Sequence, residues 1–126
     1  MLFRSDLEPD NRGYLRDLSD SYNQLGDLDG RDDPAKARDW FVKGLAIRER
    51  LADLEPDNRE YLRDLSVSYG NLGDIELAAG NKPAAREWNT QGLAVTERLL
   101  TKDPTSADYK SIVDYFRRHL GGADSP

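Results

Sequence analysis

The sequence predicts an all-α protein in which helix pairs stack into a solenoid, and two observations carry this prediction. First, residues 7–27 and 54–74 differ at only four of 21 positions and are offset by 47 residues. Repetition at a fixed period of roughly 20–50 residues is typical of solenoids. Second, apolar residues within each repeat return every three or four positions, as on an amphipathic helix. No segment alternates apolar and polar residues with the period of two that marks a strand.

The first helix of each pair is defined by one apolar stripe. The stripe of the first repeat predicts a helix near residues 11–28, and that of the second repeat predicts one near 58–79. Asp57 and Thr105 each precede an acidic residue by three positions, which is the spacing of an N-terminal cap. We therefore expect helices to start near 58 and 106. The two stripes are Leu15, Leu18, Tyr22 and Leu25, followed by Leu62, Leu65, Tyr69 and Leu72.

The second helix of each pair is expected near residues 34–54 in the first repeat and 83–102 in the second. Each of these segments opens close to a proline, and a missing N–H costs little in the first turn of a helix. The turns that precede them contain Gly30 and Gly80, and we expect both glycines to adopt the left-handed conformation that ends many helices.

Residues inside the second helices indicate how they pack. Gly44 and Gly92 are equivalent, and each costs its helix about 1 kcal/mol relative to alanine, which predicts a close approach by another helix. Trp40 and Trp88 are likewise equivalent, at a spacing of 48 residues. We expect these two rings to pack between helices rather than to line a ligand pocket.

The repeats divide the chain into a single domain with a cap at its carboxyl end. Residues 2–7 align with residues 49–54, so the chain begins within a repeat, as expected of a segment of a larger regulatory protein. The last predicted helix has an apolar face, with Lys110 and Asp114 on its polar side, and the outer surface of a terminal unit must be polar. The expected layout is repeat 1 at about 7–53, repeat 2 at about 54–101, a capping helix at about 105–120 and a tail at 121–126.

Composition excludes several classes of function. The 18 basic and 24 acidic residues give a net charge of −6, so the molecule repels phosphate and we expect no binding to nucleic acid. The chain has no cysteine for disulfides or thiolate metal sites. No apolar run approaches the ~18 residues of a membrane span, and the acidic start does not fit a secretory signal. We expect a cytoplasmic protein without membrane association.

No catalytic arrangement is recognisable in the sequence. His119 is the only histidine, and its place near a helix end favours an interaction with backbone carbonyl groups. The carboxylates concentrate in turns and first helical turns, where they cap helices and aid solubility. We therefore expect no catalytic residues, no metal and no cofactor, and we predict that the protein is not an enzyme.

The repeats resemble a known family. The string Leu65, Tyr69 and Leu72-Gly73-Asp74, followed by Ala85, Gly92 and Pro104, resembles the tetratricopeptide repeat. The unit of 47–48 residues is longer than the usual unit and is similar to those of kinesin light chains and bacterial signalling proteins. This resemblance implies antiparallel helix pairs in a right-handed solenoid, with the first helices lining a concave groove that binds protein partners without catalysis.

A row of basic residues is the candidate binding site. If the first helices lie side by side, residues at a spacing of 47 form a ladder along the groove, and nearby amides are placed to donate to a peptide backbone. Arg63 has no acidic residue four positions later, so we expect it to be the least neutralised member. Arg48 is expected on an outer helix, away from the ladder. The candidate peptide-binding residues are Arg16, Asn23, Arg63, Asn71, Lys110, Arg117 and Arg118.

Two interpretations of these residues stay open. In one, the ladder binds an extended acidic segment or a carboxylate terminus, and the chain is a non-catalytic protein–protein interaction scaffold. In the other, Arg16 with Asp20 and Lys110 with Asp114 are ordinary solvated pairs worth ~0.2–0.5 kcal/mol each. The alternative function is a structural role in self-association, as a homodimer formed through the first helix and the amino-terminal residues 1–7, because no preceding helix covers Tyr14.

Overall fold

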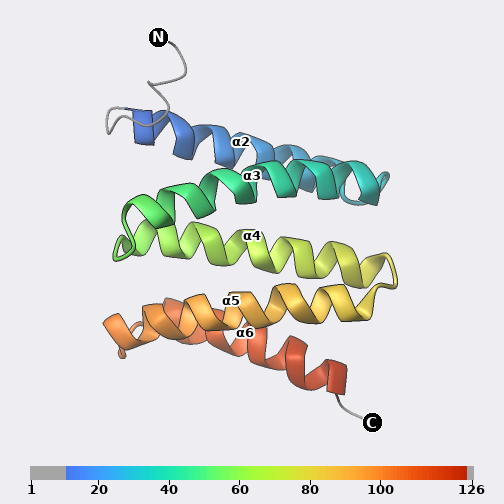
Figure 1. Ribbon diagram of the computed structural model, residues 1–126. Helices are drawn as coiled ribbons and strands as arrows, with labels where there is room; N and C mark the ends of the chain where they lie inside the picture. Colours follow the sequence, from blue (N-terminus) through green and yellow to red (C-terminus); the bar gives the residue numbers. More distant parts are fainter. Residues whose placement is uncertain (1–10, 125–126) are drawn as a thin grey trace.

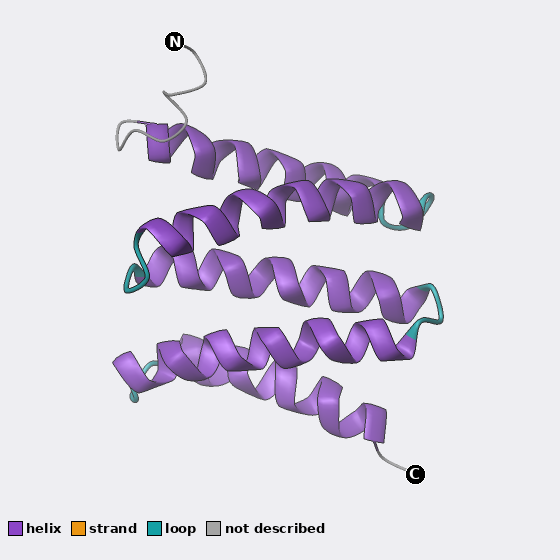
Figure 2. Cartoon of the chain, in the orientation of Figure 1, coloured by secondary structure: helices purple, strands orange, loops and turns teal. Residues whose placement is uncertain are grey.

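The computed structural model describes residues 11–124 of the chain, and over that range it consists of five α-helices joined by short turns (Figures 1 and 2). Each helix packs antiparallel against the next one along the chain, so the five form a single stack. The all-α fold is thereby confirmed, with helices close to the predicted ranges. The helices are α2 (Arg12–Asp29), α3 (Pro34–Leu54), α4 (Arg59–Ala78), α5 (Lys82–Lys102) and α6 (Ala107–Asp124).

Two helix caps lie one residue later than the sequence predicted. Asn58, not Asp57, caps α4, and its side-chain oxygen accepts a hydrogen bond from the Tyr61 N–H at 3.1 Å. The hydroxyl of Ser106, not that of Thr105, accepts from the N–H three residues later, at the start of α6. The Asp57 carboxylate instead binds the Lys102 ammonium group at 2.8 Å, because it lies in the turn beside the end of α5.

The helix ends differ from the predictions at two glycine positions. Gly80 has φ +81°, the left-handed conformation expected of it, whereas Gly30 has φ −54° and remains right-handed. The tail predicted from residue 121 begins later, because α6 continues to Asp124. Gly80 is the only left-handed residue among those that the structure describes, so no such turn ends α6 at Gly121.

Small residues set the closest helix contacts, as predicted. A Cβ built on Gly44 would lie 3.3 Å from the Ser19 carbonyl oxygen of α2, and one built on Gly92 would overlap the Phe116 ring of α6. Trp40 and Trp88 also pack between helices, stacked on Tyr22 and Tyr69 at centroid distances of 5.8 and 6.0 Å, and both stay half-buried. The buried cluster at the centre of the stack comprises Ala37, Phe41, Leu45, Ala52, Leu62, Leu65, Tyr69, Leu72, Ile75, Val95 and Leu99.

The two ends of the stack differ in character. At the carboxyl end, α6 buries Val113 and Phe116. At the other end, α2 leaves three large apolar side chains exposed, namely Tyr14, Leu25 and Leu28. Residues 2–7, which align with the end of a second helix, lie outside the described residues.

Candidate functional site

The first helices of the repeats, α2, α4 and α6, share one face of the stack, which we call the first-helix face. Side-chain contacts join α2 to α4 and α4 to α6 directly on this face. Between α4 and α6 the face contains a groove of about 420 Å³. Val67, Ile112 and Phe116 contribute apolar surface to this groove, and Arg63 and Asn71 contribute polar groups.

Arg63 is paired across the groove rather than unneutralised. Its guanidinium binds the Asp108 carboxylate of α6 through two hydrogen bonds, Nε to Oδ2 at 2.7 Å and Nη2 to Oδ1 at 2.9 Å. These bonds raise the pKa of Arg63 and lower the pKa of Asp108. The expectation that Arg63 is the least neutralised member of the ladder is therefore wrong. Its partner lies on the next first helix, 45 residues later in the sequence. The sequence prediction considered only the residue four positions after Arg63 on the same helix.

Arg16 makes the equivalent contact one repeat earlier. Its Nε donates to Asp64 Oδ2 of α4 at 2.7 Å, and its Nη1 lies 3.5 Å from Glu60. The hydrogen bond to Asp64 is the largest cause of a raised Arg16 pKa. The expected pair with Asp20 is not formed, because Asp20 binds Arg48 of α3 instead. Arg16 and Arg63 thus each link one first helix to the next.

The two candidate amides lie in contact with each other. Asn71 Nδ2 of α4 donates to Asn23 Oδ1 of α2 at 2.9 Å, so the pair spans neighbouring repeats on the first-helix face. Asn23 Nδ2 and Asn71 Oδ1 make no hydrogen bond with any residue of the described range. One donor and one acceptor are therefore available for a peptide backbone, which presents the same two kinds of group.

The basic residues of α6 are exposed and only partly neutralised. Lys110 and Arg118 form no ion pair within residues 11–124, and the expected pair of Lys110 with Asp114 is absent there. Arg117 Nη2 lies 3.3 Å from Glu97 of α5, so this side chain turns away from α4. The structure therefore gathers Arg63 and Asn71 at the groove, with Lys110 on the helix that forms its second wall.

Arg48 is a polar centre that the sequence interpretation misplaced. It is not on the outside of its helix but 4% exposed, between α2 and α4. Its guanidinium donates to the hydroxyls of Ser19 and Ser68 at 3.2 and 3.0 Å, and to Asp20 at 2.8 Å. A further hydrogen bond reaches the Asp64 carbonyl oxygen at 3.2 Å. Its place in the apolar stripe of α3, one turn before the buried Leu51, was the available indication of burial.

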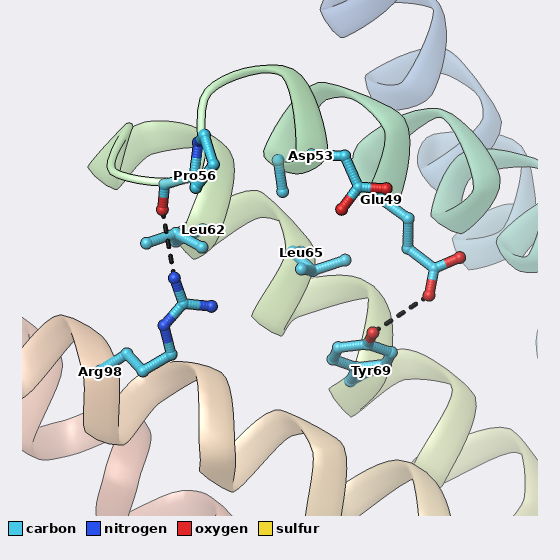
Figure 3. Close-up of a pocket in the computed structure, with 8 residues that line it drawn as sticks. Glu49, Asp53, Pro56, Leu62, Leu65, Tyr69 and Arg98 are labelled. Carbon is cyan, nitrogen blue, oxygen red and sulfur yellow. Dashed lines mark hydrogen bonds between the residues drawn. The ribbon is translucent and has the colours of Figure 1, made fainter.

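A second cavity, of about 430 Å³, lies between α3 and α5 over the side of α4 (Figure 3). Its acidic side is formed by Glu49 and Asp53, and Arg98 lies on the opposite side. The Tyr69 hydroxyl donates to Glu49 at 3.1 Å, and burial together with this carboxylate raises the pKa of Tyr69 to about 12. Arg98 donates to the Pro56 carbonyl oxygen at 3.2 Å. The Tyr69 hydroxyl and the Arg98 guanidinium are thus both hydrogen-bonded to other residues that line the cavity.

The described residues do not bring together the ligands of a metal site. Residues 11–124 contain no group of three or more His, Asp or Glu side chains able to hold a metal ion. His119 Nδ1 lies 2.7 Å from the Tyr115 carbonyl oxygen in the preceding turn, and Nε2 lies 3.7 Å from Asp74. No helix in this range is both long and apolar enough to cross a membrane.

Comparison with known proteins identifies the repeat. Residues 65–104 match the tetratricopeptide repeat, in the variety found in kinesin light chains. The match runs from within α4 through α5 to the turn before α6. No curated protein and no solved structure matches the chain. The predicted resemblance is confirmed over this segment.

Proposed function

We propose that this chain, which carries a tetratricopeptide repeat, is a non-catalytic scaffold that binds an extended segment of a partner protein in the groove between α4 and α6. Repeats of this kind generally mediate protein–protein interactions. The observation that supports this groove is its combination of apolar walls with two kinds of polar group. These are the exposed ion pair of Arg63 with Asp108 and the amide pair of Asn71 with Asn23, which leaves one donor and one acceptor unbonded. Apolar surface with a few placed polar groups is what a specific peptide site requires.

The Arg63 pair is the element of this site that a partner can exchange. Both of its side chains are nearly half exposed, and an exposed ion pair contributes only about 0–1 kcal/mol to the fold. A carboxylate of the partner can therefore replace Asp108 at small cost, using the same planar fork. The Arg16 pair is less exchangeable, because Asp64 is largely buried.

An acidic segment is the partner that the free cations of α6 would attract. The groove lining itself holds Arg63 with the carboxylates of Asp74 and Asp108, and Lys110 and Arg118 lie outside the lining on α6, where they have no ion-pair partner in the described range. This attraction acts within one Debye length, ~8 Å at physiological salt, although the whole molecule carries a net charge of −6.

Arg63→Ala tests the proposal against a matched control. The probes are peptides selected on the immobilised chain from a random ten-residue library with free carboxyl ends. Calorimetry then measures the affinity of each selected peptide for the chain. We expect acidic sequences to be enriched and Arg63→Ala to weaken them by about 1–3 kcal/mol. Arg50→Ala removes an equally charged, exposed residue from α3 and should leave the affinity unchanged. Equal losses in both variants, or selection of no acidic peptide, would contradict the proposal.

A further inference from the structure

The two ends of the groove between α4 and α6 differ in charge. At the end where both helices begin, Arg63 lies against Asp108, and the proposed function seats a carboxylate of the partner there. Toward the end of α4, the groove lining contains Asp74, whose side chain is 54% exposed. The groove therefore offers a cation at one end and an anion at the other.

Asp74 has hydrogen-bonding capacity that the described residues do not use. Its Oδ1 accepts a hydrogen bond from the Tyr115 hydroxyl at 2.7 Å and lies 3.7 Å from Nε2 of His119. Its Oδ2 makes no hydrogen bond with any residue of the described range, and no lysine or arginine of that range forms an ion pair with it. The negative end of the α4 dipole lies on the same side. This end of the groove therefore attracts a cation.

The middle of the groove is apolar. Val67 and Ile112 are half-buried there, and Gly70 contributes no side chain. A Cβ built on Gly70 would lie 3.5 Å from the rings of Tyr115 and Phe116, which is ordinary contact, so the glycine leaves space beside these rings. The groove can thus accept one apolar side chain between its two charged ends.

We propose that the partner segment carries the pattern acidic–x–apolar–x–basic, in one chain direction or the other, with its basic residue at Asp74. This inference rests on the proposed function, because it takes the acidic residue to lie at Arg63.

The length of the groove sets the spacing of the pattern. Arg63 and Asp74 are 11 positions apart on α4, which corresponds to about 16 Å along the helix. An extended chain rises about 3.3 Å per residue and turns alternate side chains to the same face. The first, third and fifth side chains of such a segment therefore face the groove and span about 13 Å, and the long charged side chains at its ends cover the remaining distance.

The opposite charges also fix the register of the segment. A segment bound the wrong way round would bring its basic residue to Arg63 and its acidic residue to Asp74, and such like-charge contacts weaken binding. An entirely acidic segment would make one favourable and one unfavourable contact. The groove therefore discriminates between segments by the position of their charges as well as by their net charge.

Calorimetry on the full chain with ten-residue peptides tests this pattern. The first probe contains Glu-Thr-Leu-Thr-Lys, or its reverse if that order binds more tightly, between glycine and serine residues and with both ends blocked. A second probe replaces the lysine by glutamine and should bind about two- to fivefold more weakly, the effect of one exposed ion pair. A third probe has one more threonine beside the lysine, which turns that side chain to the opposite face and should remove the same advantage. Equal affinities of the three probes would overturn the inference.

Asp74→Asn locates the basic end of the segment. It keeps an oxygen for the Tyr115 hydroxyl but removes the charge, so the advantage of lysine over glutamine should disappear. Asp114→Asn makes the same change at an exposed carboxylate of α6 outside the groove lining, and the advantage should persist. Asp74→Lys should reverse the preference, so that a probe with glutamate at both ends binds more tightly than the lysine probe. Equal effects of Asp74→Asn and Asp114→Asn would overturn the inference.

Failure of this inference and failure of the proposed function give different results. If the probes bind and Arg63→Ala weakens them selectively, but lysine gives no advantage, the groove binds an acidic segment and only the inference is overturned. If no probe binds the chain, or if Arg63→Ala and Arg50→Ala act alike, the proposed function fails and the inference fails with it.

Discussion

Removal of the Arg48 side chain should destabilise the fold more than removal of any exposed arginine. Its guanidinium is buried between α2, α3 and α4 and donates to four groups on the two neighbouring helices. Arg48→Ala leaves the hydroxyl oxygens of Ser19 and Ser68 without these donors and opens a cavity along the aliphatic stem.

The magnitude follows from these losses and from one compensation. Hydrogen bonds from a charged donor contribute about 1.5–3 kcal/mol each, but the buried guanidinium also pays a desolvation cost that the variant no longer bears. Asp20 is 46% exposed, so water replaces its lost partner. We therefore expect Arg48→Ala to lower the free energy of unfolding by about 2–4 kcal/mol.

Urea unfolding followed by circular dichroism and tryptophan fluorescence measures this change. Arg50→Ala is the matched control, because Arg50 lies on the same helix, exposed, and forms no ion pair among the described residues. It should stay within about 0.5 kcal/mol of the wild type. If Arg48→Ala falls within about 1 kcal/mol of Arg50→Ala, the buried network does not hold the first repeat to the second, and the reasoning fails.

Two further variants test the packing and the electrostatics. Gly92→Ala should lower the free energy of unfolding by about 1–3 kcal/mol despite the better helix propensity of alanine, because the new methyl group overlaps an aromatic ring of α6. Gly13→Ala is the control and should be neutral or stabilising, because a Cβ there has no atom within 4 Å. Equal free energies of unfolding of the two variants in urea would contradict this prediction. The ion pair with Arg63 lowers the Asp108 pKa in the folded chain, so its stabilising effect is present above the unfolded value of about 3.9 and is lost as the pH falls through the folded pKa. The stability difference between the wild type and Asp108→Asn should thus be constant above about pH 5 and shrink in acid, and a difference independent of pH down to full protonation would show that the pair has no net effect.

The fold was predictable because local and repeated patterns agree. The stripes on α4 and α5 recur at helical spacing, and their near copies in the first repeat fix the register of the stack. Turn details were less predictable, because Asn58 and its neighbour Asp57 are both good caps by residue type and only the backbone path decides between them. Gly30 shows the same limit, since glycine permits a left-handed conformation without requiring it.

For the candidate site residues, the sequence indicated which positions are equivalent but not which groups they bind. The offset of 47 residues predicted equivalent positions for Arg16 and Arg63, and in the structure each binds an aspartate of the next first helix. Their carboxylate partners were missed because an ion pair between repeats depends on the rotation of one helix against another, which no spacing within a helix encodes. Arg48 was misplaced for a related reason, since its burial depends on the serines of two other helices.

Mapping a bound peptide by NMR tests the central claim most directly. A selected acidic peptide is titrated into the isotopically labelled chain, and the backbone amide shifts are followed residue by residue. We expect the largest shifts to cluster around the groove, at Arg63, Asn71 and Ile112, and to become smaller as the salt concentration rises. Shifts concentrated instead around Glu49 and Arg98, in the cavity between α3 and α5, would contradict this expectation.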